Sequence, residues 1–156
     1  MRSLILLLIA AAIAIPCTGQ TAPAPSTATS PSDEEQAIRK VMDEQVAAWN
    51  HGDLEGYMAS YWNSPEVMFY SGATETKGWQ ETLARYRHNY QGKGKTMGQL
   101  TMSNVRIEML GPDAALVRAV WSLKLPDGST PHGLTTLIFR RMPEGWRIIH
   151  DHSSGA

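Results

Sequence analysis

The sequence predicts an α+β fold in which about three N-terminal helices pack on a strongly bent, mostly antiparallel sheet. Between residues 33 and 90, apolar residues recur every three or four positions, which is the spacing of helices with one buried face. From Met97 onward the period changes to two, as in strands with one buried face. Short turns such as "PDGSTP" and "MPEG" join these strands. They favour an antiparallel meander with helices on one side, a cone-like arrangement.

The first two helices have recognisable ends. Either Ser30 or Ser32 can cap the first helix, and Gly52 in "NHGD" ends it in the left-handed position that favours glycine. Asp53 then caps the second helix. Gln45 lies within the apolar stripe of the first helix and requires a partner if it is buried, either a ligand or a backbone carbonyl.

The second helix is predicted to run from Leu54 to Trp62, where "NSP" stops it. A short strand in "EVMFY" follows, then a Gly/Thr loop, then a third helix from about Trp79 that "QGKGK" breaks. About four long strands complete the chain.

Strict alternation in the last strand, "GWRIIHDHSS", assigns its side chains to two faces. We expect the concave face of the sheet to carry Trp146, Ile148, His150 and His152. The opposite face is expected to carry Arg147, Ile149 and Asp151.

The N-terminal part of the chain reads as an export signal. Residues 4–15 form an apolar run too short to span a membrane, so we predict a signal peptide over residues 1–19, a Pro/Ser/Thr/Ala linker over 20–32 and the domain over 33–156. The mature protein is expected to be secreted or periplasmic, without stable membrane association. A lipid anchor on Cys17 and an uncleaved anchor are the alternatives, although Pro16 fits lipoprotein processing poorly.

Composition and motifs exclude several classes of function. The chain has 14 Lys and Arg against 15 Asp and Glu, with no basic cluster, so nucleic acid is not an expected partner. It contains no nucleophile elbow, phosphate-binding glycine loop or HExxH motif. Two histidines at alternate strand positions can reach one ion, but no second ligand pair has recognisable spacing. We therefore predict neither a metal nor a cofactor.

Three stretches, "AAWNHGDLEGYMASYW", "GWQETL" and "GWRIIHDHSS", resemble the NTF2-like superfamily, in particular its SnoaL-like or DUF4440 branch. The last strand is also similar to the association domain of calcium/calmodulin-dependent kinases. The resemblance covers roughly residues 33–154. It implies a conical pocket between helices and sheet and a homodimer formed through the sheet. It implies much less about activity, because the superfold hosts isomerases, cyclases, dehydratases and binding modules.

The ketosteroid isomerase pattern of this superfamily is absent from the sequence. The resemblance places Gln45 where that pattern has a tyrosine, and Phe69 or Tyr70 where it has a carboxylate base. Thr135 and Thr136 occupy the region of its strand acid. We therefore do not expect that mechanism, and the sequence does not decide whether the protein is an enzyme.

His152 is the candidate catalytic residue, because a histidine changes charge near neutral pH and serves as a general acid or base. Its alternative role is a hydrogen bond to helix backbone that fixes the last strand. Arg118 is either a pocket cation for a carboxylate ligand or part of a salt bridge in a dimer. The predicted ligand-binding residues are Gln45, Trp49, Tyr61, Trp79, Tyr86, Arg118, Trp121 and His150, of which the aromatic ones also suit a plain core.

These observations predict an exported domain that binds a small apolar or aromatic molecule. They leave open whether the domain also converts that molecule. Any conversion is expected to be acid–base chemistry of the isomerase, cyclase or dehydratase type. The alternative is a non-catalytic homodimerisation or association module. An open pocket with a polar tip favours the first, and an interior filled by side chains favours the second. A homodimer is expected in either case, because helices can cover only one of the two apolar sheet faces.

Overall fold

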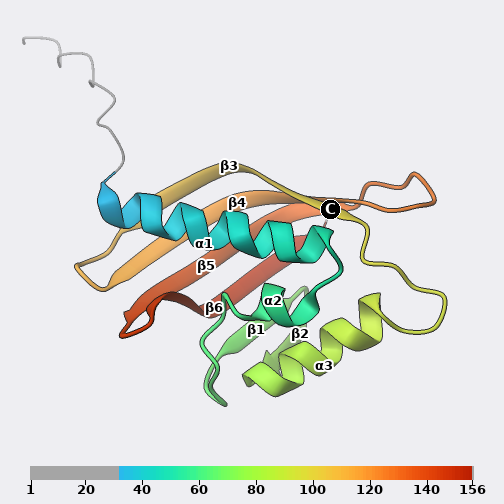
Figure 1. The fold of residues 1–156 in the computed structure, drawn as a ribbon, viewed down its shortest axis with the longest axis horizontal. Helices are drawn as coiled ribbons and strands as arrows, with labels where there is room; N and C mark the ends of the chain where they lie inside the picture. The colour runs from blue at the N-terminus through green and yellow to red at the C-terminus, as the bar shows by residue number, and fades with distance from the viewer. Residues whose placement is uncertain (1–31, 156) are drawn as a thin grey trace, which may run out of the picture. The chain divides into compact units, whose positions relative to one another are not determined.

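The computed structural model describes residues 32–155, and the predicted signal peptide and most of the predicted linker lie outside this range. A six-stranded sheet carries three helices on one side (Figure 1). No helix among the described residues is long and apolar enough to cross a membrane. In chain order the elements are α1 (Asp33–Asn50), α2 (Leu54–Met58), β1 (Met68–Ser71), β2 (Thr74–Lys77), α3 (Trp79–Tyr90), β3 (Gln99–Met109), β4 (Ala114–Lys124), β5 (His132–Met142) and β6 (Gly145–Gly155).

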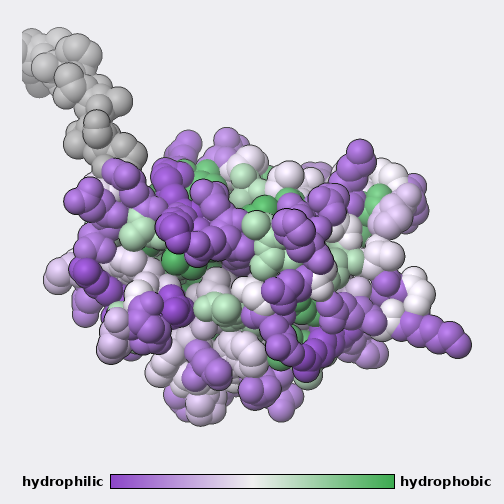
Figure 2. Space-filling view, viewed as in Figure 1, coloured by the Kyte–Doolittle hydropathy of each residue, from purple (hydrophilic) through white to green (hydrophobic). Residues whose placement is uncertain are grey.

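The helix caps agree with the sequence. The Ser32 hydroxyl accepts a hydrogen bond from the backbone N–H of Glu35 at 3.2 Å, which satisfies a free donor of the first turn. The Asp53 carboxylate accepts one from the N–H of Gly56 at 2.8 Å at the start of α2. Helix α1 lies across the sheet and buries the stripe that the sequence predicts (Figure 1). The viewed surface is mostly hydrophilic, with small apolar areas between the polar side chains (Figure 2).

The sheet has the order β2-β1-β6-β5-β4-β3. Strands β3 to β6 form the predicted antiparallel meander, and β1 pairs with β6 in parallel. The segment predicted to be a Gly/Thr loop instead forms β2, which pairs with β1. Gly72, at φ 56°, allows the tight turn between the two strands.

Helix α2 is shorter than predicted, because it ends at Met58 instead of Trp62. Strand β6 offers free backbone groups at this point. The N–H of Ile148 donates to the carbonyl of Ser60, and the N–H of Trp62 donates to the carbonyl of Ile148, both at 2.9 Å. These bonds replace the next helical turn and hold the segment after α2 against the sheet.

A β-bulge interrupts β6. Phe139 of β5 is opposite Ile148, whereas the preceding residue, Ile138, is opposite His150. Ile149 is therefore an extra residue on β6, and the alternation of side chains shifts by one position after it.

Because of the bulge, side chains of the last strand beyond Ile149 lie on the faces opposite to those predicted. Trp146 and Ile148 lie in the core as expected, at 3% and 0% exposure. Beyond the bulge, Asp151 takes the inward position at 3% exposure, and His152 is exposed. The prediction that both histidines share the inner face is wrong, because strict alternation assumed an unbulged strand.

Candidate functional site

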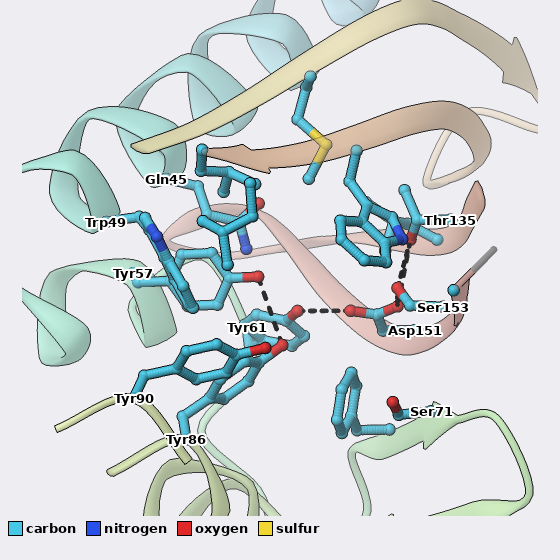
Figure 3. A pocket seen from close by; sticks show the side chains of 17 residues that line it. Gln45, Trp49, Tyr57, Tyr61, Ser71, Tyr86, Tyr90, Thr135, Asp151 and Ser153 are labelled. Carbon is cyan, nitrogen blue, oxygen red and sulfur yellow. Dashed lines mark hydrogen bonds between the residues drawn. The ribbon is translucent and has the colours of Figure 1, made fainter. Parts of the chain in front are cut away.

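A cavity of about 230 Å³ lies between the helices and the inner face of the sheet and opens to solvent. Most of its lining is aromatic or aliphatic. Asp151, Ser153 and Thr135 lie together on one side, whereas the amide of Gln45 lies on the opposite side, beside Trp49 (Figure 3). The lining residues are Gln45, Trp49, Tyr57, Tyr61, Phe69, Ser71, Tyr86, Tyr90, Leu100, Met102, Trp121, Leu123, Thr135, Leu137, Asp151, Ser153 and Gly155.

Helices α1, α2 and α3 supply an aromatic wall to the cavity. The ring of Trp49 lies 5.0 Å from that of Tyr57 and 4.8 Å from that of Tyr90, measured between centroids, in edge-to-face arrangements. Tyr86 packs edge-to-face on Tyr57 at 5.3 Å. Such pairs contribute to stability beyond the area they bury, so the wall is held in place without a ligand.

Asp151 forms the polar side of the cavity, together with three hydroxyl groups (Figure 3). The Tyr61 hydroxyl donates to Oδ2 of Asp151 at 2.6 Å. Oδ1 accepts from the Ser153 hydroxyl at 2.8 Å and from the Thr135 hydroxyl at 3.2 Å. The bulge in β6 creates this cluster, because it turns Asp151 and Ser153 inward next to Thr135 of β5.

Burial raises the pKa of the Asp151 carboxyl above its usual range, and the three hydroxyl donors and the nearby His150 act in the opposite direction. Burial, and then the neighbouring Asp151 charge, raise the pKa of the Tyr61 phenol well above its ordinary value. Burial also raises the pKa of Tyr86 well above that value. The phenols are therefore neutral donors, and Asp151 is the group of this cluster able to gain or lose a proton.

Gln45 is buried at 2% exposure and lines the cavity from α1. Its Nε2 donates to the Ser60 hydroxyl at 2.6 Å, and that hydroxyl donates to the carbonyl of Tyr57 at 2.8 Å. The sequence left open whether the partner of Gln45 is a ligand or a backbone carbonyl. The structure instead shows a side-chain hydroxyl, which fixes the amide at the edge of the cavity.

The structure brings together five of the residues predicted to bind a ligand, namely Gln45, Trp49, Tyr61, Tyr86 and Trp121. Trp79 and Arg118 do not line the cavity. The indole N–H of Trp79 donates to the carbonyl of Met58 at 2.8 Å, which ties α3 to α2. Arg118 forms a salt bridge with Glu108 of the adjacent strand at 2.8 Å, and both side chains are about half exposed.

The two predicted site histidines lie outside the cavity. The rings of His150 and His152 pack near the ring of Tyr70 on the outer face, with centroid distances of 5.4 and 5.9 Å. The placement of His152 in the pocket is therefore wrong, and so is that of His150. Asp151 and Ser153 are among the lining residues that sequence reasoning missed, because nothing in "GWRIIHDHSS" marks the bulge that turns them inward. No group of three or more His, Cys, Asp or Glu among the described residues is arranged to hold a metal.

A family model described as a SnoaL-like domain matches residues 38–156. The chain belongs to this family. The expected resemblance to the SnoaL-like branch of the NTF2-like superfamily is thereby confirmed, and so is the α+β fold. The search of curated proteins finds no significant match.

Solved structures give the same fold. An NTF2-like protein of unknown function from Shewanella oneidensis is 39% identical with a TM-score of 0.70, over 76% of this chain and 97% of that one. A putative calcium/calmodulin-dependent protein kinase type II association domain from Thiobacillus denitrificans is 22% identical with a TM-score of 0.64. That match covers 76% of this chain and 94% of the other. The second likeness concerns the fold alone.

Proposed function

We propose that the domain binds a small, largely apolar or aromatic molecule in the cavity, within an exported protein. The observation that carries this proposal is an open cavity with aromatic walls and a hydrogen-bonded carboxyl on one side. Binding sites for small molecules have this composition, with an apolar lining and a few polar groups that fix orientation.

The size of the cavity limits the ligand. A cavity of about 150 Å³ in a protein core accommodates benzene. The volume of about 230 Å³ here therefore suits a molecule with one or two rings, or an aliphatic molecule of similar size. Larger ligands would have to extend through the opening.

The same features argue against a module used for association alone. Such a module is expected to fill its interior with side chains, as protein cores do. Burying a carboxyl costs free energy that an apolar side chain at Asp151 would not incur. Contact between the carboxyl and a ligand would explain why a carboxyl is kept at this position in spite of that cost.

Acid–base conversion of the ligand is a second candidate function. It is favoured by the position of Asp151, which lines the cavity while Tyr61 donates to one of its oxygens. A carboxyl whose pKa is raised by burial is suited to exchange protons with a bound molecule. Asp151 takes over the acid–base role that the sequence assigned to His152.

Native mass spectrometry of the protein purified from its own host tests the binding proposal. We expect a small molecule to co-purify with the protein and to be lost from Met102→Trp, because the larger side chain would fill the cavity from β3. Met142→Trp, at the end of β5 and away from the cavity, is the matched control. A ligand that remained bound to Met102→Trp would place its site elsewhere and refute the proposal.

A further inference from the structure

The charged groups that line the cavity narrow the class of ligand further than the shape of the cavity does. Among residues 32–155, none of the side chains that line the cavity is a Lys, Arg or His, whereas Asp151 lines it and is 3% exposed. A buried carboxylate normally has a cationic partner, because an unpaired buried charge is costly. This carboxyl has hydroxyl partners instead.

The hydrogen bonds around Asp151 suit its ionised form. A carboxylate has about four lone-pair sites, and three hydroxyl groups donate to Asp151. The Tyr61 bond of 2.6 Å has the length of a charge-assisted O–H···O⁻ bond. Oδ1 accepts two of the three bonds and Oδ2 accepts one, so Oδ2 retains an acceptor site.

Two basic side chains, His150 and Arg85, contact residues of the neighbouring strands without entering the cavity. His150 is adjacent along β6 but lies on the outer face, beside Tyr70. Arg85 lies over the ring of Phe69 at 5.4 Å from its centroid and donates to the Thr76 hydroxyl at 3.0 Å. Neither basic side chain lines the cavity.

Aromatic rings make up much of the remaining wall. Trp49, Tyr57, Tyr86, Tyr90 and Trp121 line the cavity, from three helices and β4. The face of an aromatic ring carries partial negative charge and attracts cations within about 6 Å, most strongly when water is excluded. Aromatic rings and a carboxylate that line one cavity suit a positively charged organic group.

We propose that the ligand is a small organic ammonium ion. Its charged nitrogen lies toward Asp151, and its apolar substituents contact the aromatic wall. This inference rests on the proposed function and narrows its ligand class. The ligand supplies the positive charge that the lining residues lack, and the rings favour the ligand over a neutral molecule of the same shape.

Choline and 3,3-dimethylbutan-1-ol test the inference, because they differ only in a charged nitrogen in place of a neutral carbon. Titration calorimetry of the purified protein should give an affinity for choline roughly tenfold or more above that for the alcohol, given desolvated cation–π contacts. Competition between the two probes would show that they share one site, and loss of both from Met102→Trp would place that site in the cavity.

Two sets of variants test which side chains cause the preference for choline over the alcohol. Asp151→Asn should lower the ratio of choline affinity to alcohol affinity, because the negative charge is lost while the rings remain. Asp113→Asn, an equal change of charge at an exposed turn, should leave the ratio unchanged. If Asp151→Asn does not fold, Tyr90 provides a second test. Tyr90→Phe should keep the preference for choline and Tyr90→Leu should reduce it, because the ring face is lost only in the second.

The outcomes separate this inference from the proposed function. Equal affinity for the two probes would overturn the ammonium ligand and leave a neutral ligand in the same cavity. The absence of binding by either probe at millimolar concentration would also overturn it. The mass spectrum of the purified protein and the Met102→Trp variant then decide the proposed function by themselves.

Discussion

Asp151 is a buried carboxyl whose pKa is raised, chiefly by burial, so the folded protein holds its proton at higher pH than the unfolded chain does. The stability that this proton provides is fully present below the pKa of the unfolded chain. It is lost as the pH rises through the higher pKa of the folded protein. Asp151→Asn removes this dependence.

We therefore predict that the wild type loses unfolding free energy relative to Asp151→Asn as the pH rises above the usual range of an Asp carboxyl. Urea denaturation of both proteins from acidic to neutral pH measures the difference. Asp113→Asn is the control and should follow the wild type, because its side chain is exposed. A wild type that gained stability relative to Asp151→Asn with rising pH would contradict the prediction.

Strand β6 shows why some site residues follow from the sequence and others do not. Helical spacing places Trp49 and Gln45 on one buried stripe, and regular alternation places Trp121 on the inner face of β4. These positions depend on local periodicity alone. The inward position of Asp151 depends on a bulge in the pairing of β6 with β5, which the alternation of residues within β6 does not reveal.

Because of the bulge, we predict different effects on ligand binding for substitutions at two neighbouring residues of β6. His152→Ala should change the unfolding free energy by no more than about 0.5 kcal/mol and leave ligand binding intact, because its side chain is exposed on the outer face. Ser153→Ala should weaken ligand binding, because it removes a donor to Asp151. Thermal melts and titration of both variants measure this, and a larger loss of binding in His152→Ala would contradict the observed register.

The core part of the same strand provides a second matched pair. Ile148 is fully buried, whereas the bulge residue Ile149 is partly exposed. Ile148→Ala should cost about 2–5 kcal/mol of unfolding free energy, because it leaves a cavity under the helices. Ile149→Ala should cost clearly less. Chemical denaturation of both variants tests this order, and equal losses would mean that the two side chains are equally buried.

At the scale of the whole molecule, the outer face of the sheet is the candidate interface between two copies of the chain. Helices lie on one side of the long strands, and the outward positions of β4 and β5 include Leu116, Val120, Leu134 and Ile138. Leu134 is 62% exposed in the single chain, which is high for a leucine within a strand. An apolar patch on a sheet face is suited to contact the same patch of a second copy across a two-fold axis.

A homodimer through this face therefore remains our prediction for the protein in solution. Leu134→Asp should shift the mass measured by light scattering from dimer to monomer at micromolar concentration, because it places a charge in the apolar interface. Leu110→Asp is the control, since Leu110 is 56% exposed but follows the end of β3, outside the strand face. A monomeric wild type would contradict the predicted dimer. A Leu134→Asp variant that stayed dimeric would move the interface to another surface.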